Sequence, residues 1–170
     1  FPSTLLGIHR HLFTGVFSEE IPVGKFRTVN ITKKEPVLDG ETVQYSSHFM
    51  IQDTLAYDFE KEKNFSYRNL TNEQKALHAM AFLADIWQVH PFREGNTRTV
   101  AVFGIQYLRK LGFHIDNSLF SEHAAYFRNS LVFYHHHGEK QDKHFLKIFF
   151  ENLLLGKKNV LLDEDMYAKE

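Results

Sequence analysis

A run of apolar residues in the middle of the chain is the feature that most restricts the fold. Between residues 76 and 89 the sequence ALHAMAFLADIWQV places apolar side chains at nearly every angle around a helix. A helix that is apolar on all sides has no face for solvent, so other elements must surround it. Just before this run, Thr71 and Gln74 form the Thr-x-x-Gln pattern of a capping box, which predicts where the helix begins. We therefore expect a mainly α protein built around one buried helix.

The spacing of apolar residues elsewhere predicts further helices and one β element. Helical periodicity covers about 5–13, 49–59, 97–111, 121–135 and 142–155, and Ser121 is placed to cap the fourth of these. Between residues 17 and 52, β-forming residues flank Pro36 and the turn pair Asp39-Gly40, which predicts a β-hairpin. Because no repeat or linker divides the sequence, we expect a single domain over 1–170, with its core at about 8–155 and a polar tail at 156–170.

Composition and charge narrow the classes of partner. With 43% hydrophobic residues the chain can bury a core without disulfides, and the absence of cysteine removes thiolate metal sites and a thiol nucleophile. A net charge of −1 gives no field that attracts nucleic acid or an anionic membrane, so we expect neither partner, and no apolar run is long enough to span a bilayer. We expect a cytoplasmic protein, and secretion as an effector stays open.

A polar turn joins the two most apolar helical segments. The first segment ends at His90, Pro91 prevents its simple continuation, and Gly95 with Asn96 opens the next helix. Backbone N–H groups at the start of a helix converge on one point and carry the positive end of the helix dipole, an arrangement that binds phosphate. The sequence therefore predicts an anion site at this turn.

The side chains around the turn have complementary chemistry. Arg98 presents a fork of donors suited to phosphoryl oxygens, Glu94 presents a hard oxygen suited to Mg²⁺, and a neutral His90 can accept a proton from an attacking hydroxyl. Taken singly, His90 and Pro91 are also a helix stop, Glu94 a charge that complements the dipole, and Arg98 a solvated neighbour. Together they favour a binding site, because polar residues around a buried turn cost apolar core unless something is bound there.

The segment His90-Pro-Phe-Arg-Glu-Gly-Asn-Thr-Arg98 resembles the motif of the Fic-domain family, HPFx(D/E)GN(G/K)R, at eight of nine positions. We take the resemblance to extend from about Ile8 to Leu155. It implies the Fic fold, a helical bundle around a central pair of motif helices with a β-hairpin flap. It also implies a protein adenylyltransferase, which moves AMP from ATP to a hydroxyl of a target protein.

The resemblance assigns roles to individual residues. His90 would be the base that deprotonates a Tyr, Thr or Ser hydroxyl of the target, and Glu94 would bind the Mg²⁺ that bridges the phosphates of ATP. The residues implied in nucleotide binding are Arg93, Gly95, Asn96, Thr97, Arg98 and Tyr126, the last as a lining for the base or ribose, although an aromatic residue at its spacing also fits the core. The flap that docks the target by strand addition would comprise Val43, Gln44, Tyr45, Ser46, Ser47 and His48.

Two positions depart from the family pattern. Thr97 stands where Gly is usual in AMP-transferring members and Lys in phosphate-transferring ones, so this position does not fix the orientation of the nucleotide. Many members carry a second Arg three residues after the first, where this sequence has Ala101. The contact to the γ-phosphate that this Arg would make therefore needs another donor.

Three other functions compete with adenylyl transfer. The same site can transfer UMP, GMP, phosphate or phosphocholine, and the sequence does not separate these groups. A catalytically silent binding module is a second alternative, and the complete set of His90, Glu94, Asn96 and Arg98 argues against it. A de-AMPylating phosphodiesterase is the third, but the family's regulatory and hydrolytic glutamate lies in an (S/T)xxxE(G/N) pattern, and Lys147 stands four residues before the candidate Glu151. Without that glutamate, we expect inhibition by a small antitoxin-like protein in trans or by a further segment of the protein.

Overall fold

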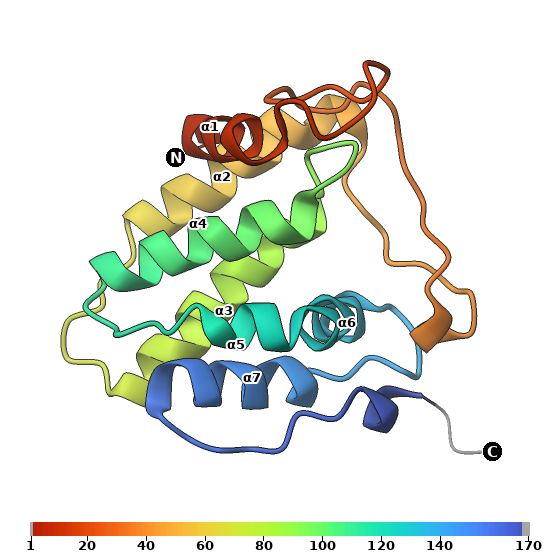
Figure 1. Cartoon of the computed structure of the whole chain (residues 1–170). Helices are drawn as coiled ribbons and strands as arrows, with labels where there is room; N and C mark the ends of the chain where they lie inside the picture. Colours follow the sequence, from red (N-terminus) through yellow and green to blue (C-terminus); the bar gives the residue numbers. More distant parts are fainter. Residues whose placement is uncertain (1, 168–170) are drawn as a thin grey trace.

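The protein folds around one central helix, α3 (Asn72–Val89), in the computed structural model shown in Figure 1, which describes residues 2–167. Helix α3 contacts α2 (Ile51–Lys63), α4 (Asn96–Lys110), α6 (Ala124–His135) and α7 (His144–Leu155). Its side chains Ala79, Ala84, Ile86 and Trp87 are fully inaccessible to solvent. The expectation of a buried central helix is confirmed.

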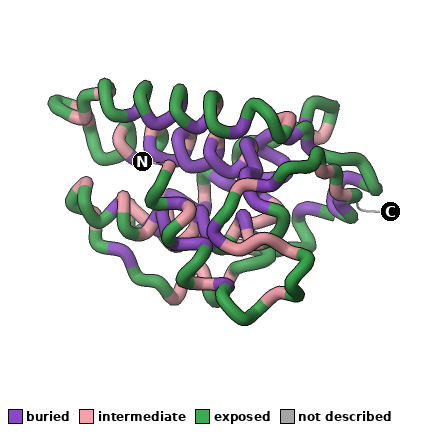
Figure 2. Tube along the Cα trace, turned by 90° about the horizontal axis from the view of Figure 1, so that it is seen from above, coloured by how far each residue is buried: buried purple, intermediate pink, exposed green. Residues whose placement is uncertain are grey.

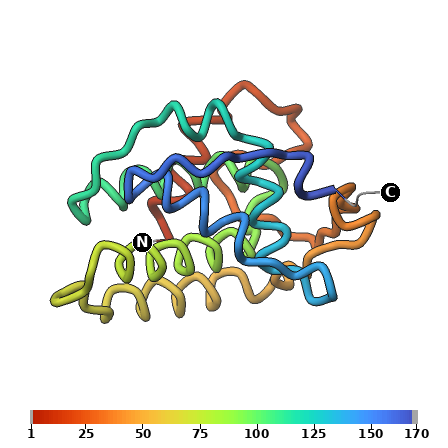
Figure 3. The backbone as a smooth tube through the Cα atoms, turned by 90° about the horizontal axis from the view of Figure 1, so that it is seen from below, coloured from red at the N-terminus to blue at the C-terminus, as the bar shows by residue number. Residues whose placement is uncertain are grey.

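The other helices pack around α3. Helix α1 (Pro2–Phe13) lies against α4 and α2, and the short α5 (Ser118–Glu122) lies against α6. Helices α2 and α3 run side by side when the molecule is seen from below (Figure 3), and the buried residues form a continuous middle layer (Figure 2). Three short 3₁₀ helices complete the elements: η1 (Pro36–Leu38), η2 (His48–Met50) and η3 (Asp163–Met166). No helix within residues 2–167 has both the length and the hydrophobicity needed to cross a membrane.

The start of α3 follows from its sequence. The backbone N–H of Gln74 donates to Thr71 Oγ1 at 3.1 Å, and the backbone N–H of Thr71 donates to Gln74 Oε1 at 3.0 Å. The predicted capping box is confirmed. The expected helix over 121–135 is wrong at its beginning, because the helical conformation is interrupted at His123, between α5 and α6. The Ser121 hydroxyl donates to the Ser118 carbonyl and does not cap α6.

The expected β-hairpin is absent: the structure has no strand within residues 2–167. The segment between α1 and α2 begins with turns and bends over residues 14–29 and then reverses direction at η1. At η1 the N–H groups of Glu35 and Gly40 donate to the carbonyls of Glu41 and Glu35, each at 2.9 Å. Beyond this turn the arms do not form a ladder. Arg27 in the first arm donates from its side chain to the Ser46 carbonyl in the second, and a side-chain anchor replaces the backbone pairing of a hairpin.

Candidate active site

The nine-residue motif forms the loop between α3 and α4 and the first three residues of α4, and Figure 1 shows the chain leaving the central helix at this loop and re-entering the bundle. His90 ends α3 in the left-handed conformation, with φ at 52°. Its backbone N–H and its ring Nδ1 both lie 3.0 Å from the Trp87 carbonyl oxygen. Because a carbonyl oxygen only accepts hydrogen bonds, Nδ1 carries the proton in neutral His90. The lone pair is therefore on Nε2.

Asn96 holds the loop in shape. Its side-chain amide donates to the Phe92 carbonyl and accepts from the Phe92 N–H, both at 2.8 Å, and the residue is buried. The sequence places Asn96 in nucleotide binding, but its side chain is used within the loop. Its backbone N–H, at the start of α4, is one of the donors that a helix leaves without an internal partner.

Gly95 has a steric reason to lack a side chain. It caps α4 with φ at 84°, and a Cβ atom at this position would lie 2.4 Å from Cε2 of Phe13 in α1. The sequence suggests that this glycine allows an anion to approach the backbone. The structure adds that α1 packs directly on the loop at this point.

Two residues that the sequence analysis did not assign to the site, Arg27 and His9, fix the loop from outside. Buried Arg27 donates from Nε to the His90 carbonyl at 2.7 Å and from Nη2 to the Val89 carbonyl at 3.1 Å, so it satisfies the carboxyl end of α3. His9 stacks on Phe92 with ring centroids 3.9 Å apart, and its Nε2 lies 2.8 Å from the Glu94 carbonyl oxygen. Neither residue carries a motif signal. An arginine and a histidine within apolar stretches are the only hint in the sequence.

His90 is held in a dry, positively charged environment. It is 2% exposed, and its Nε2 is buried without a hydrogen-bond partner. Burial is the main reason that the pKa of His90 falls to about 3; the positive charges of Lys33, Arg128 and Arg27 act in the same direction, and the Trp87 carbonyl opposes them. His90 is therefore neutral at physiological pH, in the form that accepts a proton.

The flap segment covers this histidine. Within residues 43–48, Val43 and Tyr45 are buried while Gln44 and His48 are exposed, with Ser46 and Ser47 between these extremes. The Tyr45 ring stacks on the His90 ring with centroids 4.0 Å apart. The Gln44 carbonyl accepts from the Gln88 side chain at 3.3 Å, which ties the segment to α3. Residues 43–48 therefore lie against His90 and α3, without the strand pairing that was expected.

A cavity of about 630 Å³ lies beside the motif, between α4 and the α5–α6 region. Its polar lining includes Arg98, which is exposed in the first turn of α4, and Arg128 of α6. The rest of its lining consists of Thr97, Ala101, Val102, Ile105, Asn117, Phe120, Ser121, Ala124, Ala125 and Phe127. A largely apolar cavity of this size with a few cations is typical of small-molecule sites.

Glu94 is available for a metal ion. Its side chain is 49% exposed, and its nearest ion-pair partner is Lys33, with Nζ 3.9 Å from Oε2. Mg²⁺ is commonly held by one or two carboxylates together with substrate phosphates and water, and it needs no cage of protein ligands. One accessible carboxylate just before the start of α4 fits this donor set. Arg93, which directly precedes Glu94 in the loop, is also exposed.

Two further expected residues make contacts that the sequence did not reveal. Thr97 Oγ1 accepts a hydrogen bond from the Trp87 indole N–H at 3.0 Å, so its hydroxyl is engaged by α3. Tyr126 is buried, donates its hydroxyl to the Phe145 carbonyl at 3.0 Å and is not among the residues lining the cavity. The structure therefore places Tyr126 in the core and leaves the lining of the cavity to its neighbours Ala125 and Phe127.

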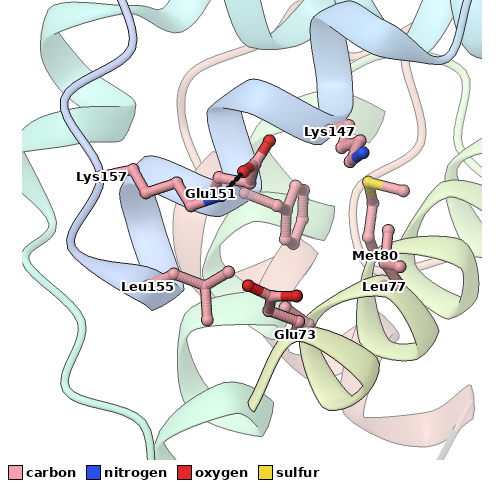
Figure 4. Close-up of a pocket in the computed structure, with 9 residues that line it drawn as sticks. Glu73, Leu77, Met80, Lys147, Glu151, Leu155 and Lys157 are labelled. Atoms are coloured by element: carbon pink, nitrogen blue, oxygen red, sulfur yellow. Dashed lines mark hydrogen bonds and ion pairs between the residues drawn. The ribbon is translucent and has the colours of Figure 1, made fainter. Parts of the chain in front are cut away.

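A second, smaller cavity of about 120 Å³ lies between the first half of α3 and α7 (Figure 4). Glu151, the glutamate considered above as an inhibitory residue, lines this cavity and pairs with Lys157. None of its lining residues belongs to the motif.

Two curated bacterial proteins are similar to this chain. It is 31% identical over 117 residues to the probable protein adenylyltransferase y4lH of Sinorhizobium fredii, an alignment that covers 65% of this chain and 54% of that protein. It is 29% identical over 109 residues to the protein adenylyltransferase VbhT of Bartonella schoenbuchensis, covering 64% of this chain and 21% of that protein. The chain thus spans about half of one relative and about a fifth of the other.

A solved structure and a family model agree with these relatives. The BepC protein of Bartonella tribocorum, solved with bound AMPPNP, superposes with a TM-score of 0.65 over 89% of this chain and 72% of that one, at 19% identity, which supports the fold. The model of the Fic/DOC family matches residues 2–108, which include α1, the flap segment, the motif and nearly all of α4. This chain belongs to the Fic/DOC family.

Proposed function

We propose that this protein transfers AMP from ATP to a hydroxyl group of a target protein. The observation that carries the proposal is the buried, neutral His90 at the end of α3, where the loop that leads into α4 begins. A neutral histidine with a free lone pair on Nε2 lies at one end of the motif loop, and Arg98 at the other end lines a cavity large enough for a nucleotide. Both curated relatives bear the name protein adenylyltransferase, one of them as probable.

The reaction would proceed by displacement at the α-phosphorus of ATP. The target hydroxyl oxygen forms a bond to that phosphorus, the bond from phosphorus to the oxygen bridging to the β-phosphate breaks, and pyrophosphate leaves. His90 Nε2 takes the hydroxyl proton. Arg98 and the first N–H groups of α4 offset the negative charge on the phosphates. Positioning and electrostatics supply most of the catalysis in such transfers.

Glu94 would hold the Mg²⁺ that accompanies ATP. The ion would supply positive charge that offsets the charge of the phosphates. Lys33, at 3.9 Å from the same carboxylate, is a weak competitor for Glu94 because the pair is half exposed. The side chain can therefore turn to the metal without breaking a buried contact.

The flap would bind the target. Its extended backbone and exposed side of Gln44 and His48 suit the addition of an extended peptide, while Tyr45 faces the catalytic histidine. We also propose an inhibitor in trans, since Glu151, which lies in the cavity of Figure 4, does not face the motif.

Labelled nucleotides test the proposed group. Purified protein with Mg²⁺ and a lysate would be given ATP, UTP, GTP or CDP-choline, each labelled in the group that would be transferred. Label from ATP on protein, with little from the others, supports adenylyl transfer. Label from another donor alone would replace AMP with that group.

A further inference from the structure

One arginine outside the motif lies at the candidate nucleotide cavity. Arg128 of α6 lines the cavity together with Thr97, Arg98 and Ala101, although it is 30 positions beyond Arg98 in the sequence. Its side chain is 34% exposed and forms part of the cavity wall. Ala101, one turn after Arg98 on α4, contributes only a methyl group to the same wall.

Arg128 is held in a fixed orientation by Glu35. Nη1 and Nη2 of Arg128 donate to Oε2 and Oε1 of Glu35, both at 2.8 Å. Glu35 immediately precedes η1 and is 1% exposed, so its carboxylate is buried. A bidentate pair of this kind uses two of the five guanidinium N–H groups and leaves three for another acceptor.

The charge of Arg128 interacts with two residues of the motif loop, His90 and Glu94. It is one of the three cations that lower the pKa of His90, and the negative charge of Glu94 contributes to raising the pKa of Arg128, after the larger effect of its bond to Glu35. Arg128 therefore lines the cavity and lies within electrostatic range of His90 and Glu94. Arg98 alone is the other guanidinium among the residues that line this cavity.

We propose that Arg128, oriented by Glu35, is a second phosphate-binding residue, which contacts the phosphates beyond the α-phosphate of a nucleoside triphosphate and makes the site select triphosphates over monophosphates. The inference rests on the proposed function. Arg128 of α6 would supply a hydrogen-bond donor to the phosphates, which the methyl side chain of Ala101 in α4 cannot supply. Glu35 acts as a positioning residue, since it touches Arg128 and not the cavity.

Calorimetry with Mg·ATP and with AMP tests the assignment in the full chain. Glu35→Leu combined with Arg128→Met removes both charges, so no unpaired carboxylate is left buried. We expect this double variant to bind Mg·ATP on the order of 10- to 100-fold more weakly than the unmodified protein, the size expected for charge-assisted hydrogen bonds. We expect its affinity for AMP to change less than threefold, because AMP lacks the phosphates that Arg128 would contact.

A second variant, Arg128→Lys, tests the same role in case the double variant does not fold. In Arg128→Lys the ammonium still neutralises Glu35, but a single point charge cannot serve the carboxylate and a phosphate in two fixed directions. It should lose Mg·ATP affinity and retain AMP affinity. Adding Ala101→Arg to either variant places a guanidinium on the same wall of the cavity and should restore the preference for ATP, which a merely structural role of Arg128 would not predict.

The outcomes separate this inference from the proposed function. Unchanged Mg·ATP affinity in both variants would overturn the role of Arg128, and so would an equal loss for ATP and AMP, which would mean that the cavity itself had changed shape. If the unmodified protein binds neither nucleotide, the proposed function fails and the inference fails with it. A selective loss for ATP that Ala101→Arg restores supports both.

Discussion

His90 is neutral, as its proposed role of general base requires. Its Nδ1 is committed to the Trp87 carbonyl, and its Nε2 is buried and free of partners. Replacing it by Ala should abolish transfer, with a loss of at least about 10²-fold, because a positioned base typically contributes that much. Mg·ATP affinity should be retained, since the base acts on the incoming hydroxyl and does not hold phosphate.

The backbone at this position calls for a matched control. His90 has φ at 52°, a region that Asn tolerates better than most residues. His90→Asn should therefore lose transfer like His90→Ala while keeping a thermal midpoint closer to that of the unmodified protein. Transfer within tenfold of the unmodified protein in either variant would remove His90 from the role of base.

Glu94 and Arg98 should affect binding as well as transfer. Both side chains are exposed at the loop and the first turn of α4, so replacing either with Ala should leave the fold intact. Each is expected to weaken Mg·ATP binding, because each would face the charged phosphates or their metal. Calorimetry gives the affinities, and exposed Arg10→Ala, on the outside of α1, is the control for removing a surface charge. Unchanged affinity in both variants would contradict the site.

At the scale of an element, the flap determines the environment of the base. Tyr45 stacks on His90 at 4.0 Å and helps to keep water from Nε2. Tyr45→Ala should therefore raise the pKa of His90 from about 3 toward its ordinary value near 6.5, since burial is the main cause of the shift. Histidine chemical shifts followed by NMR through a pH titration measure this change.

Tyr45→Phe separates the ring from the hydroxyl. The Tyr45 hydroxyl is buried without a hydrogen-bond partner, which costs about 1–3 kcal/mol. The Phe variant keeps the stacked ring, so the pKa of His90 should stay low while the free energy of unfolding rises by about 1 kcal/mol. If both variants leave the pKa of His90 unchanged, the flap is not what shields the base.

The elements differ in how far the sequence predicts them. The central helix, its capping box and the chemistry of the loop follow from local patterns, because helical periodicity, Thr71 with Gln74, and the motif are all short-range signals. The prediction of a hairpin was wrong because two β-prone arms pair only if their backbone groups have no other partners. Here the Arg27 side chain donates to the Ser46 carbonyl. Tyr126 could not be separated from the core by spacing alone, and the place of Arg128 depends on how α6 packs.

For the whole molecule, buried neutral histidines should make the fold sensitive to acid. Burial lowers the pKa of His135 to about 4, as it lowers that of His90 to about 3. The unfolded chain binds protons at these positions below about pH 6.5, while the folded chain does not until the pH is much lower. Their contribution to stability is therefore complete above about pH 6.5 and falls as the pH is lowered toward 4, by at most about 1.4 kcal/mol per pH unit for each histidine.

Urea unfolding at several pH values measures this slope. Asp58 acts in the opposite direction, because burial raises its pKa to about 6 and favours the folded state as the pH falls through 6. A variant comparison isolates the histidine: His135→Gln should lose stability less steeply between pH 6.5 and 4.5 than the unmodified protein. Exposed His11→Gln should keep the original slope. Equal slopes for His135→Gln and the unmodified protein would contradict the account.

The most direct test of the proposed activity follows the phosphorus atoms of ATP. The protein and its His90→Ala variant would be incubated with Mg²⁺ and a lysate, with ATP labelled at the α-phosphorus in one sample and at the γ-phosphorus in another. We predict that α-label becomes covalently attached to protein and γ-label leaves in pyrophosphate, and that His90→Ala attaches neither. Attachment of γ-label without α-label, or α-label at similar levels in the His90→Ala sample, would contradict adenylyl transfer by His90.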